Sequence, residues 1–172
     1  MKDSPSYMAV TETRRLAVCG LTELLTYLDG SASHVVSLID PRLPFGRIPE
    51  VKHLILRVHD IDQDLPGHDA PTAADAEALL GFIAELAAEP DPVSLVIHCH
   101  AGISRSSATA LAAMLVLDEG LDPAQALQKL AVHRPQLWPN ALLTGHFDRA
   151  LGLNGTLIEA VAAYRRNAFE NQ

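Results

Sequence analysis

The chain has few cysteines and few basic residues, and each shortage excludes a class of protein. Two cysteines, Cys19 and Cys99, in 172 residues are too few for a disulfide scaffold, which needs several bridges in a short chain. Thirteen basic residues stand against 21 acidic ones, for a formal net charge of −8. Proteins that bind nucleic acids or anionic membranes need a basic surface to neutralise phosphates. We therefore expect no nucleic-acid partner and no membrane partner, while a local basic pocket for one phosphorylated group remains compatible with this charge.

Long apolar segments are also missing. No run approaches the roughly 18 apolar residues of a membrane-spanning helix, and the first five residues lack the apolar core of a secretory signal. We therefore expect a cytoplasmic protein, in whose reducing surroundings a free reactive cysteine can persist. The length suits one domain. We expect it over residues 1–172, with a core at about 16–152, a polar N-terminal tail and a C-terminal helix.

Hydrophobic periodicity predicts that strands and helices alternate along the chain. Short runs rich in β-branched residues predict strands at 34–39, 53–58 and 93–97, and a shorter apolar run occupies 16–19. Helical spacing and capping residues predict helices at 21–28, from 72, at 104–117, from 122, at 141–151 and at 157–169. This order indicates an α/β fold: a mainly parallel central sheet flanked by helices, with a helical C-terminal part. Ligands bind such sheets at the carboxyl ends of the strands.

The segment from 94 to 107 runs from a strand through a tight loop into a helix, and it carries the candidate chemistry. Cys99 lies just before the helix N-terminus, where unpaired N–H groups and the helix dipole favour a thiolate. The same N–H groups can form a nest for three phosphate oxygens. Gly102 lets the main chain approach a ligand closely. The expected phosphate-binding loop consists of His100, Ala101, Gly102, Ile103 and Ser104, followed by Arg105.

Three further side chains complete this candidate site. Arg105 lies six positions after Cys99, where its planar fork can form two parallel hydrogen bonds to equatorial phosphate oxygens, which lysine cannot copy. Ser106 can donate a hydrogen bond to the sulfur and ease its departure from a phosphocysteine. His98 can orient the loop through its ring nitrogens.

The pattern His98-Cys99-x5-Arg105-Ser106 resembles the HCx5R[S/T] signature of the protein tyrosine phosphatases. Ala101-Gly102 is common in their dual-specificity branch, and the order of elements from about residue 16 to 151 is similar to that of the small bacterial members. The resemblance implies a general acid, which this family draws from an aspartate upstream of the cysteine. Asp60 just after a strand is the first candidate, and Asp62 and Asp64 are the alternatives.

Other chemical groups have simpler interpretations. Trp138-Pro139-Asn140 looks like the WPD loop of this family, but it follows the nucleophile and has no acid, so we expect Asn140 to cap the next helix. His98, Cys99 and His100 are consecutive and point apart, and we expect no metal and no organic cofactor. Arg42 and Arg47 flank a proline-rich loop after a strand end and could bind an anionic substrate, and the alternative is that they are simply solvated. We expect Cys19 to be buried in a strand, and a redox bridge to Cys99 stays open.

Taken together, these residues predict a phosphate monoester hydrolase that forms a phosphocysteine intermediate. The resemblance implies a protein tyrosine or dual-specificity phosphatase, acting on a phosphorylated protein or a small phosphorylated substrate. The loop lacks the lysines of the inositol-lipid phosphatases in this superfamily. A rhodanese-like sulfurtransferase and a non-catalytic phosphate-binding module are the competing interpretations. The sequence says nothing about the physiological substrate or the oligomeric state.

Overall fold

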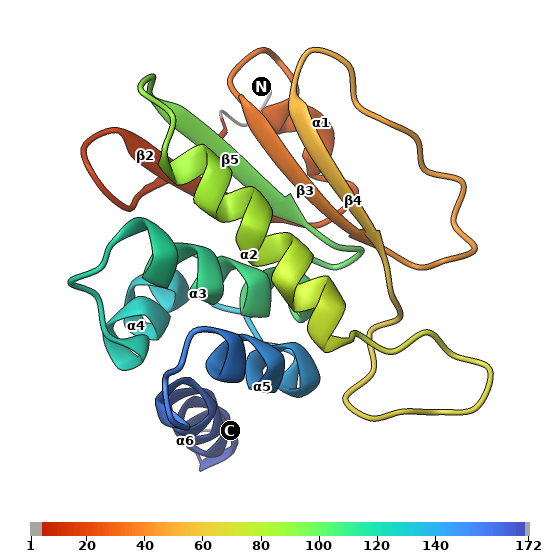
Figure 1. Cartoon of the computed structure of the whole chain (residues 1–172), viewed down its shortest axis with the longest axis vertical. Helices are drawn as coiled ribbons and strands as arrows, with labels where there is room; N and C mark the ends of the chain where they lie inside the picture. The colour runs from red at the N-terminus through yellow and green to blue at the C-terminus, as the bar shows by residue number, and fades with distance from the viewer. Residues whose placement is uncertain (1–4, 171–172) are drawn as a thin grey trace.

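The computed structural model describes residues 5–170, and within them five strands form one sheet (Figure 1). The strands are β1 (Met8–Ala9), β2 (Arg14–Cys19), β3 (His34–Ile39), β4 (Lys52–Arg57) and β5 (Val93–His98). Their order is β1-β2-β5-β3-β4, and all neighbours are parallel except β1 and β2. The predicted mainly parallel sheet is confirmed. β1 was not predicted, because two residues are too few to show a periodic pattern.

The helices of the described residues are α1 (Leu24–Tyr27), α2 (Ala73–Ala87), α3 (Arg105–Leu117), α4 (Pro123–His133), α5 (Ala141–Ala150) and α6 (Thr156–Glu170). Five of them agree with the predicted helices to within one residue at their N-terminal ends. The helix predicted over 21–28 is wrong in extent, since only 24–27 are helical. The flanking residues form turns instead, in which Glu23 N donates to Gly20 O at 3.1 Å and Leu28 N donates to Leu25 O at 3.3 Å, three residues back rather than the four of an α-helix.

Local capping explains where two of the helices begin. The Thr72 side chain accepts a hydrogen bond from Asp75 N, and the Asp75 carboxylate accepts one from Thr72 N, which completes a capping box for α2. Asp122 and Gln125 form the same arrangement at α4, with Pro123 in the first turn. Each box satisfies N–H groups that have no partner inside the helix.

Helices cover both faces of the sheet, and α2 to α6 lie on the face opposite to α1 (Figure 1). Alternate residues of a strand point to opposite faces, so Leu16 packs against the large helical cluster while its neighbour Ala17 packs with Tyr27 of α1. The large cluster also holds Met8 and Val161. Both residues lie outside the range of about 16–152 that we expect for the core. No helix among residues 5–170 is long and apolar enough to cross a membrane.

The parallel strands bring four loops to one edge of the sheet. β2, β3, β4 and β5 end at Cys19, Ile39, Arg57 and His98, and their pairing is parallel throughout. The carboxyl ends of the four strands therefore face the same side, where α/β proteins bind their ligands. The candidate site is built from the residues that follow these four ends.

Candidate active site

Cys99 is the first residue after β5, and its side chain is held at the base of the loop. It is 1% exposed. The Cys99 Sγ lies 3.1 Å from Ser106 Oγ and accepts a hydrogen bond from Gly102 N at 3.3 Å. Burial acts to raise the pKa of the Cys99 thiol, but hydrogen bonds from the Ser106 side chain and from backbone N–H groups, aided by Arg105, outweigh it and lower the pKa. The site therefore favours a thiolate.

The N-terminus of α3, into which the loop after Cys99 runs, has no side-chain cap. Ser104 is the N-cap of α3, yet its side chain makes no capping hydrogen bond, because its hydroxyl donates to Asp60 Oδ1 at 2.6 Å. Gly102 has a φ of +70°, and a Cβ there would lie 2.4 Å from the backbone carbon of Cys19. Only glycine fits this position. The loop has the form of an anion-binding nest at a helix N-terminus.

Arg105 opens α3 and is buried beside this loop, at 3% exposed. Its Nη1 donates to Asp40 Oδ1 at 2.8 Å and to Val58 O at 2.6 Å. Its Nε is also buried and has no hydrogen-bond partner within the described part of the chain. A buried N–H group without a partner is costly, so one edge of the guanidinium is fixed while the Nε–H is available for an anionic ligand.

The structure separates the three candidate aspartates. Asp60 is exposed and its Oδ1 accepts hydrogen bonds from Ser104 of the loop and from Asn140 Nδ2, at 2.6 and 3.0 Å. Asp62 instead caps α5 by accepting from Ala141 N at 2.8 Å. Asp64 is exposed in the loop that follows. Of the three, Asp60 is the one whose carboxylate contacts the loop that follows Cys99.

Asn140 is the N-cap of α5, as predicted. Its Oδ1 accepts a hydrogen bond from Leu143 N at 2.9 Å. Asn140 has a second set of contacts that was not predicted from the sequence. Its Nδ2 donates to Asp60 Oδ1 and to Ile61 O. Asn140 thus anchors the Asp60 loop to the start of α5.

The C-terminal helix braces this side of the site. Arg165 of α6 stacks over the Trp138 ring at 4.9 Å, donates to Pro139 O, and lies 3.8 Å from Asp62. Trp138 N in turn donates to Ile103 O of the loop that follows Cys99, at 2.9 Å. The segment 138–140 is therefore fixed between α6 and the loop.

His98 belongs to a buried chain of hydrogen bonds that ends at Cys99. Ile48 N donates to His53 Nδ1 at 3.0 Å, so we assign the proton of neutral His53 to Nε2, which donates to Ser37 Oγ at 2.7 Å. The Ser37 hydroxyl then donates to His98 Nε2 at 2.6 Å, and His98 Nδ1 faces Cys99 O at 3.3 Å. Burial lowers the pKa of both histidines to about 4. Both rings therefore stay neutral at physiological pH, as this chain requires.

Cys19 is buried at the end of β2, as predicted, and differs from Cys99 in chemistry. Burial, with the nearby Glu23 charge, raises the pKa of the Cys19 thiol to about 12, so it stays protonated and unreactive at neutral pH. Both cysteines are free thiols. Arg42 and Arg47 are exposed. Residues 5–170 contain no cluster of three or more side chains arranged to hold a metal ion.

Three charged residues around the loop were not predicted from the sequence. Asp40 holds Arg105 from a position 65 residues earlier. Glu23 and Arg134 pair across 111 residues, at the back of the loop. Asp40 could have been suspected from its place after a strand, because the carboxyl ends of parallel strands meet. No local pattern marks Glu23 or Arg134.

Comparison with solved structures gives the fold a known type. A single-residue variant of human DUSP28 is 24% identical, with a TM-score of 0.59, covering 87% of this chain and 99% of that one. Tk-PTP in its active form is 22% identical, with a TM-score of 0.58 and coverages of 90% and 97%. A human tyrosine phosphatase-like serine/threonine/tyrosine-interacting protein is 15% identical, with a TM-score of 0.58 and coverages of 86% and 97%. No protein-family model matches the sequence, and no curated protein is similar to it in sequence.

These likenesses show that the chain has the fold of the cysteine-dependent tyrosine and dual-specificity phosphatases. The same fold occurs in a protein whose name describes an interaction partner. The function must therefore be argued from the side chains of the site.

Proposed function

We propose that the chain is a cysteine phosphatase that hydrolyses phosphate monoesters through a phosphocysteine intermediate on Cys99. The observation that carries this proposal is the buried Nε of Arg105, which has no partner in the described residues and lies beside a thiol with a lowered pKa. A phosphate group in the loop supplies the missing acceptor. The thiolate supplies the nucleophile, and the hydrogen bonds to it reduce its repulsion of an incoming dianion.

In the first step, Cys99 Sγ attacks phosphorus in line and forms the S–P bond. The P–O bond to the leaving group breaks, its electron pair stays on the leaving oxygen, and Asp60 protonates that oxygen. Both described hydrogen bonds to this carboxyl go to Oδ1, so we assign the transferable proton to Oδ2. Arg105 and the loop N–H groups stabilise the charge on the equatorial oxygens.

In the second step, water attacks the phosphocysteine while Asp60, now a carboxylate, accepts the proton of that water. A new P–O bond forms, the S–P bond breaks, and inorganic phosphate leaves. The departing sulfur carries a negative charge again. Ser106 Oγ at 3.1 Å can donate a hydrogen bond to it.

Phosphotyrosine or mixed phosphoprotein substrates suit the site better than highly charged inositol lipids. The loop residues 100–104 contain no lysine, so beyond Arg105 they supply backbone donors for one phosphate group. Small phosphorylated metabolites fit the same chemistry. We therefore expect a phosphorylated protein or a small phosphate monoester as the substrate.

The direct test measures phosphate release from p-nitrophenyl phosphate and from a phosphotyrosyl peptide. We expect turnover of both, without added metal. Binding of inorganic phosphate with no turnover would support the non-catalytic binding module instead. Thiocyanate formation from thiosulfate and cyanide, with no phosphate release, would support the rhodanese-like alternative.

Replacing Asp60 with asparagine tests the general acid. We expect kcat to fall about 10²-fold or more for phenyl phosphate, whose leaving group needs a proton, and less for p-nitrophenyl phosphate, whose leaving group needs it less. Steady-state kinetics with both substrates measure this difference.

Asp64→Asn is the matched control, because Asp64 is exposed and belongs to the same loop. We expect this variant to keep the wild-type kcat with both substrates. If Asp62→Asn, rather than Asp60→Asn, shows the dependence on leaving group, Asp62 is the acid and our assignment is wrong.

A further inference from the structure

We infer that Arg134, held by Glu23, is a positioning residue that keeps the N–H groups of the phosphate-binding loop turned toward Cys99. This inference rests on the proposed function, since it concerns the same loop. It assigns a role to two residues that lie behind the loop and do not touch the substrate.

Arg134 follows α4 and reaches the outer side of the loop. Its Nε donates to Gly102 O at 2.9 Å, and its Nη2 donates to Ala101 O at 3.1 Å. A third loop carbonyl, that of His100, accepts from Leu21 N at 2.8 Å. Three consecutive carbonyl groups of the loop are therefore held outward, two of them by one side chain.

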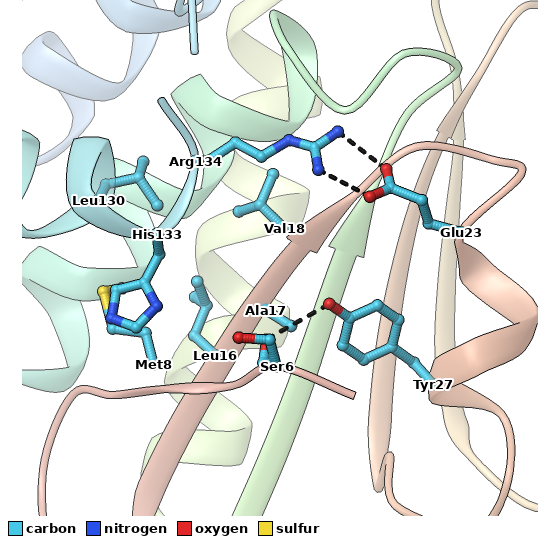
Figure 2. Close-up of a pocket in the computed structure, with 10 residues that line it drawn as sticks. All are labelled: Ser6, Met8, Leu16, Ala17, Val18, Glu23, Tyr27, Leu130, His133 and Arg134. Carbon is cyan, nitrogen blue, oxygen red and sulfur yellow. Dashed lines mark hydrogen bonds and ion pairs between the residues drawn. The ribbon is translucent and has the colours of Figure 1, made fainter. Parts of the chain in front are cut away.

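Glu23 fixes the guanidinium in this orientation. Its two carboxylate oxygens accept hydrogen bonds from Arg134 Nη1 and Nη2, both at 2.8 Å (Figure 2). Its Oε2 also accepts from Gly20 N at 2.7 Å. Such a two-point pair sets direction as well as distance. The arginine is largely buried while the glutamate is about half exposed, with side-chain exposures of 14% and 45%.

The geometry of the peptide bond converts outward carbonyls into inward N–H groups. A trans peptide unit is planar, and its C=O and N–H point in opposite directions. Holding Ala101 O outward therefore turns Gly102 N inward, where it donates to Cys99 Sγ at 3.3 Å. Holding Gly102 O outward turns Ile103 N inward, and a hydrogen bond from this N–H acts to lower the pKa of Cys99.

Close packing behind the loop leaves little room for a substitute. A Cβ on Gly20 would lie 2.9 Å from His100 O, and one on Gly102 would lie 2.6 Å from Arg134 Nη2. On its other side the pair borders a cavity of about 200 Å³, whose floor includes Leu16 and Leu130. Figure 2 shows Arg134 reaching across this cavity to Glu23. Of the polar side chains that line the cavity, Tyr27 already donates to Ser6 O at 3.3 Å, so removing the guanidinium leaves both loop carbonyls without their described donor.

The test measures the thiol pKa of Cys99 without substrate, from the pH dependence of alkylation by iodoacetamide, with peptide mass spectrometry to identify the labelled residue. In Arg134→Met, which keeps the bulk and removes the donors, we expect this pKa to be about one to two pH units higher. We expect kcat/KM for p-nitrophenyl phosphate to be roughly 100-fold lower. Glu23→Gln should have a smaller effect, because Arg134 can still reach the carbonyls.

The reversed pair, Glu23→Arg with Arg134→Glu, separates this role from a plain ion pair. It restores opposite charges but not the donors to Ala101 O and Gly102 O, so we expect it to resemble Arg134→Met. Recovery of the wild-type thiol pKa in the reversed pair would overturn the inference, as would a wild-type thiol pKa in Arg134→Met. The control is Arg166→Met, which removes an exposed 2.8 Å pair with Glu159 on α6 and should change neither measurement.

Two further measurements keep the outcomes distinct. If thermal unfolding shows that Arg134→Met does not fold, Arg134→Lys replaces it; a lysine cannot reproduce the fork to both carbonyls, so its thiol pKa should also lie above that of the wild type. If the wild type hydrolyses no phosphate monoester, the proposed function fails. Alkylation of Cys99 still decides the role of Arg134 in that case.

Discussion

Replacing Cys99 with serine is expected to lower kcat for p-nitrophenyl phosphate by about 10⁴-fold or more. The loop lowers the pKa of a thiol, but a serine hydroxyl starts from a far higher pKa and would need a base. The described partners of the sulfur are the Ser106 hydroxyl and backbone N–H groups, and none of them is a base that can take up a proton. Binding of inorganic phosphate, measured by calorimetry, should persist because the N–H groups and Arg105 remain.

The matched control is Cys19→Ala, which removes the other thiol from the chain. Cys19 is buried and protonated at neutral pH, so its loss should leave kcat within about a factor of two and lower the unfolding midpoint slightly through a small cavity. If Cys99→Ser retains wild-type turnover, the phosphocysteine mechanism is wrong.

Replacing Arg105 with lysine should lower kcat/KM by about 10² to 10³-fold. The guanidinium can donate to Asp40 and Val58 O through Nη1 and still present its Nε–H to the phosphate. A lysine ammonium keeps the positive charge but lacks this planar arrangement. We expect kcat to fall and the inhibition constant of inorganic phosphate to rise, because bound phosphate and the transition state carry charge on the same oxygens.

Arg166→Lys controls for the general loss of an arginine, since Arg166 is exposed on α6. It should leave the kinetics unchanged. Arg105→Lys with wild-type kcat/KM and wild-type phosphate inhibition would show that the unpartnered Nε does not face the substrate.

The sequence predicted well those strands and helices whose ends are set by residues close together in the chain. The β-branched run at 34–39 ends at Asp40-Pro41, and the observed β3 has the predicted bounds. α3 and α4 begin within one residue of the predicted positions, because a tight loop and a capping box mark them. The Cys99 to Ser106 pattern likewise indicated a loop in which the sulfur and the serine hydroxyl meet.

Contacts between distant segments account for what the sequence did not predict. α1 is shorter than its leucine spacing suggests, because the residues on either side form turns with hydrogen bonds to the residue three positions back, and Leu21 N is tied to His100 O of a distant loop. Among the three candidate aspartates, Asp60 is distinguished by the hydrogen bond it accepts from Ser104, which is 44 residues away in the sequence. Such partners leave no periodic signal, because they are determined by which loops the parallel strands bring to one edge of the sheet.

Because the site is built from loops that follow four different strands, the acidity of its cysteine depends on folding of the whole sheet. Backbone donors to the Cys99 sulfur come from the loop, and this loop is held by Leu21 after β2 and by Arg134 after α4. A chain in which these segments have not yet packed against the loop therefore lacks this support. In an unfolded chain the two thiols share an ordinary acidity. Folding makes Cys99 more acidic and Cys19 far less acidic. The ratio of labelling at Cys99 to labelling at Cys19 should therefore be high in folded molecules and near one in unfolded ones, so it reports the folded fraction of a sample.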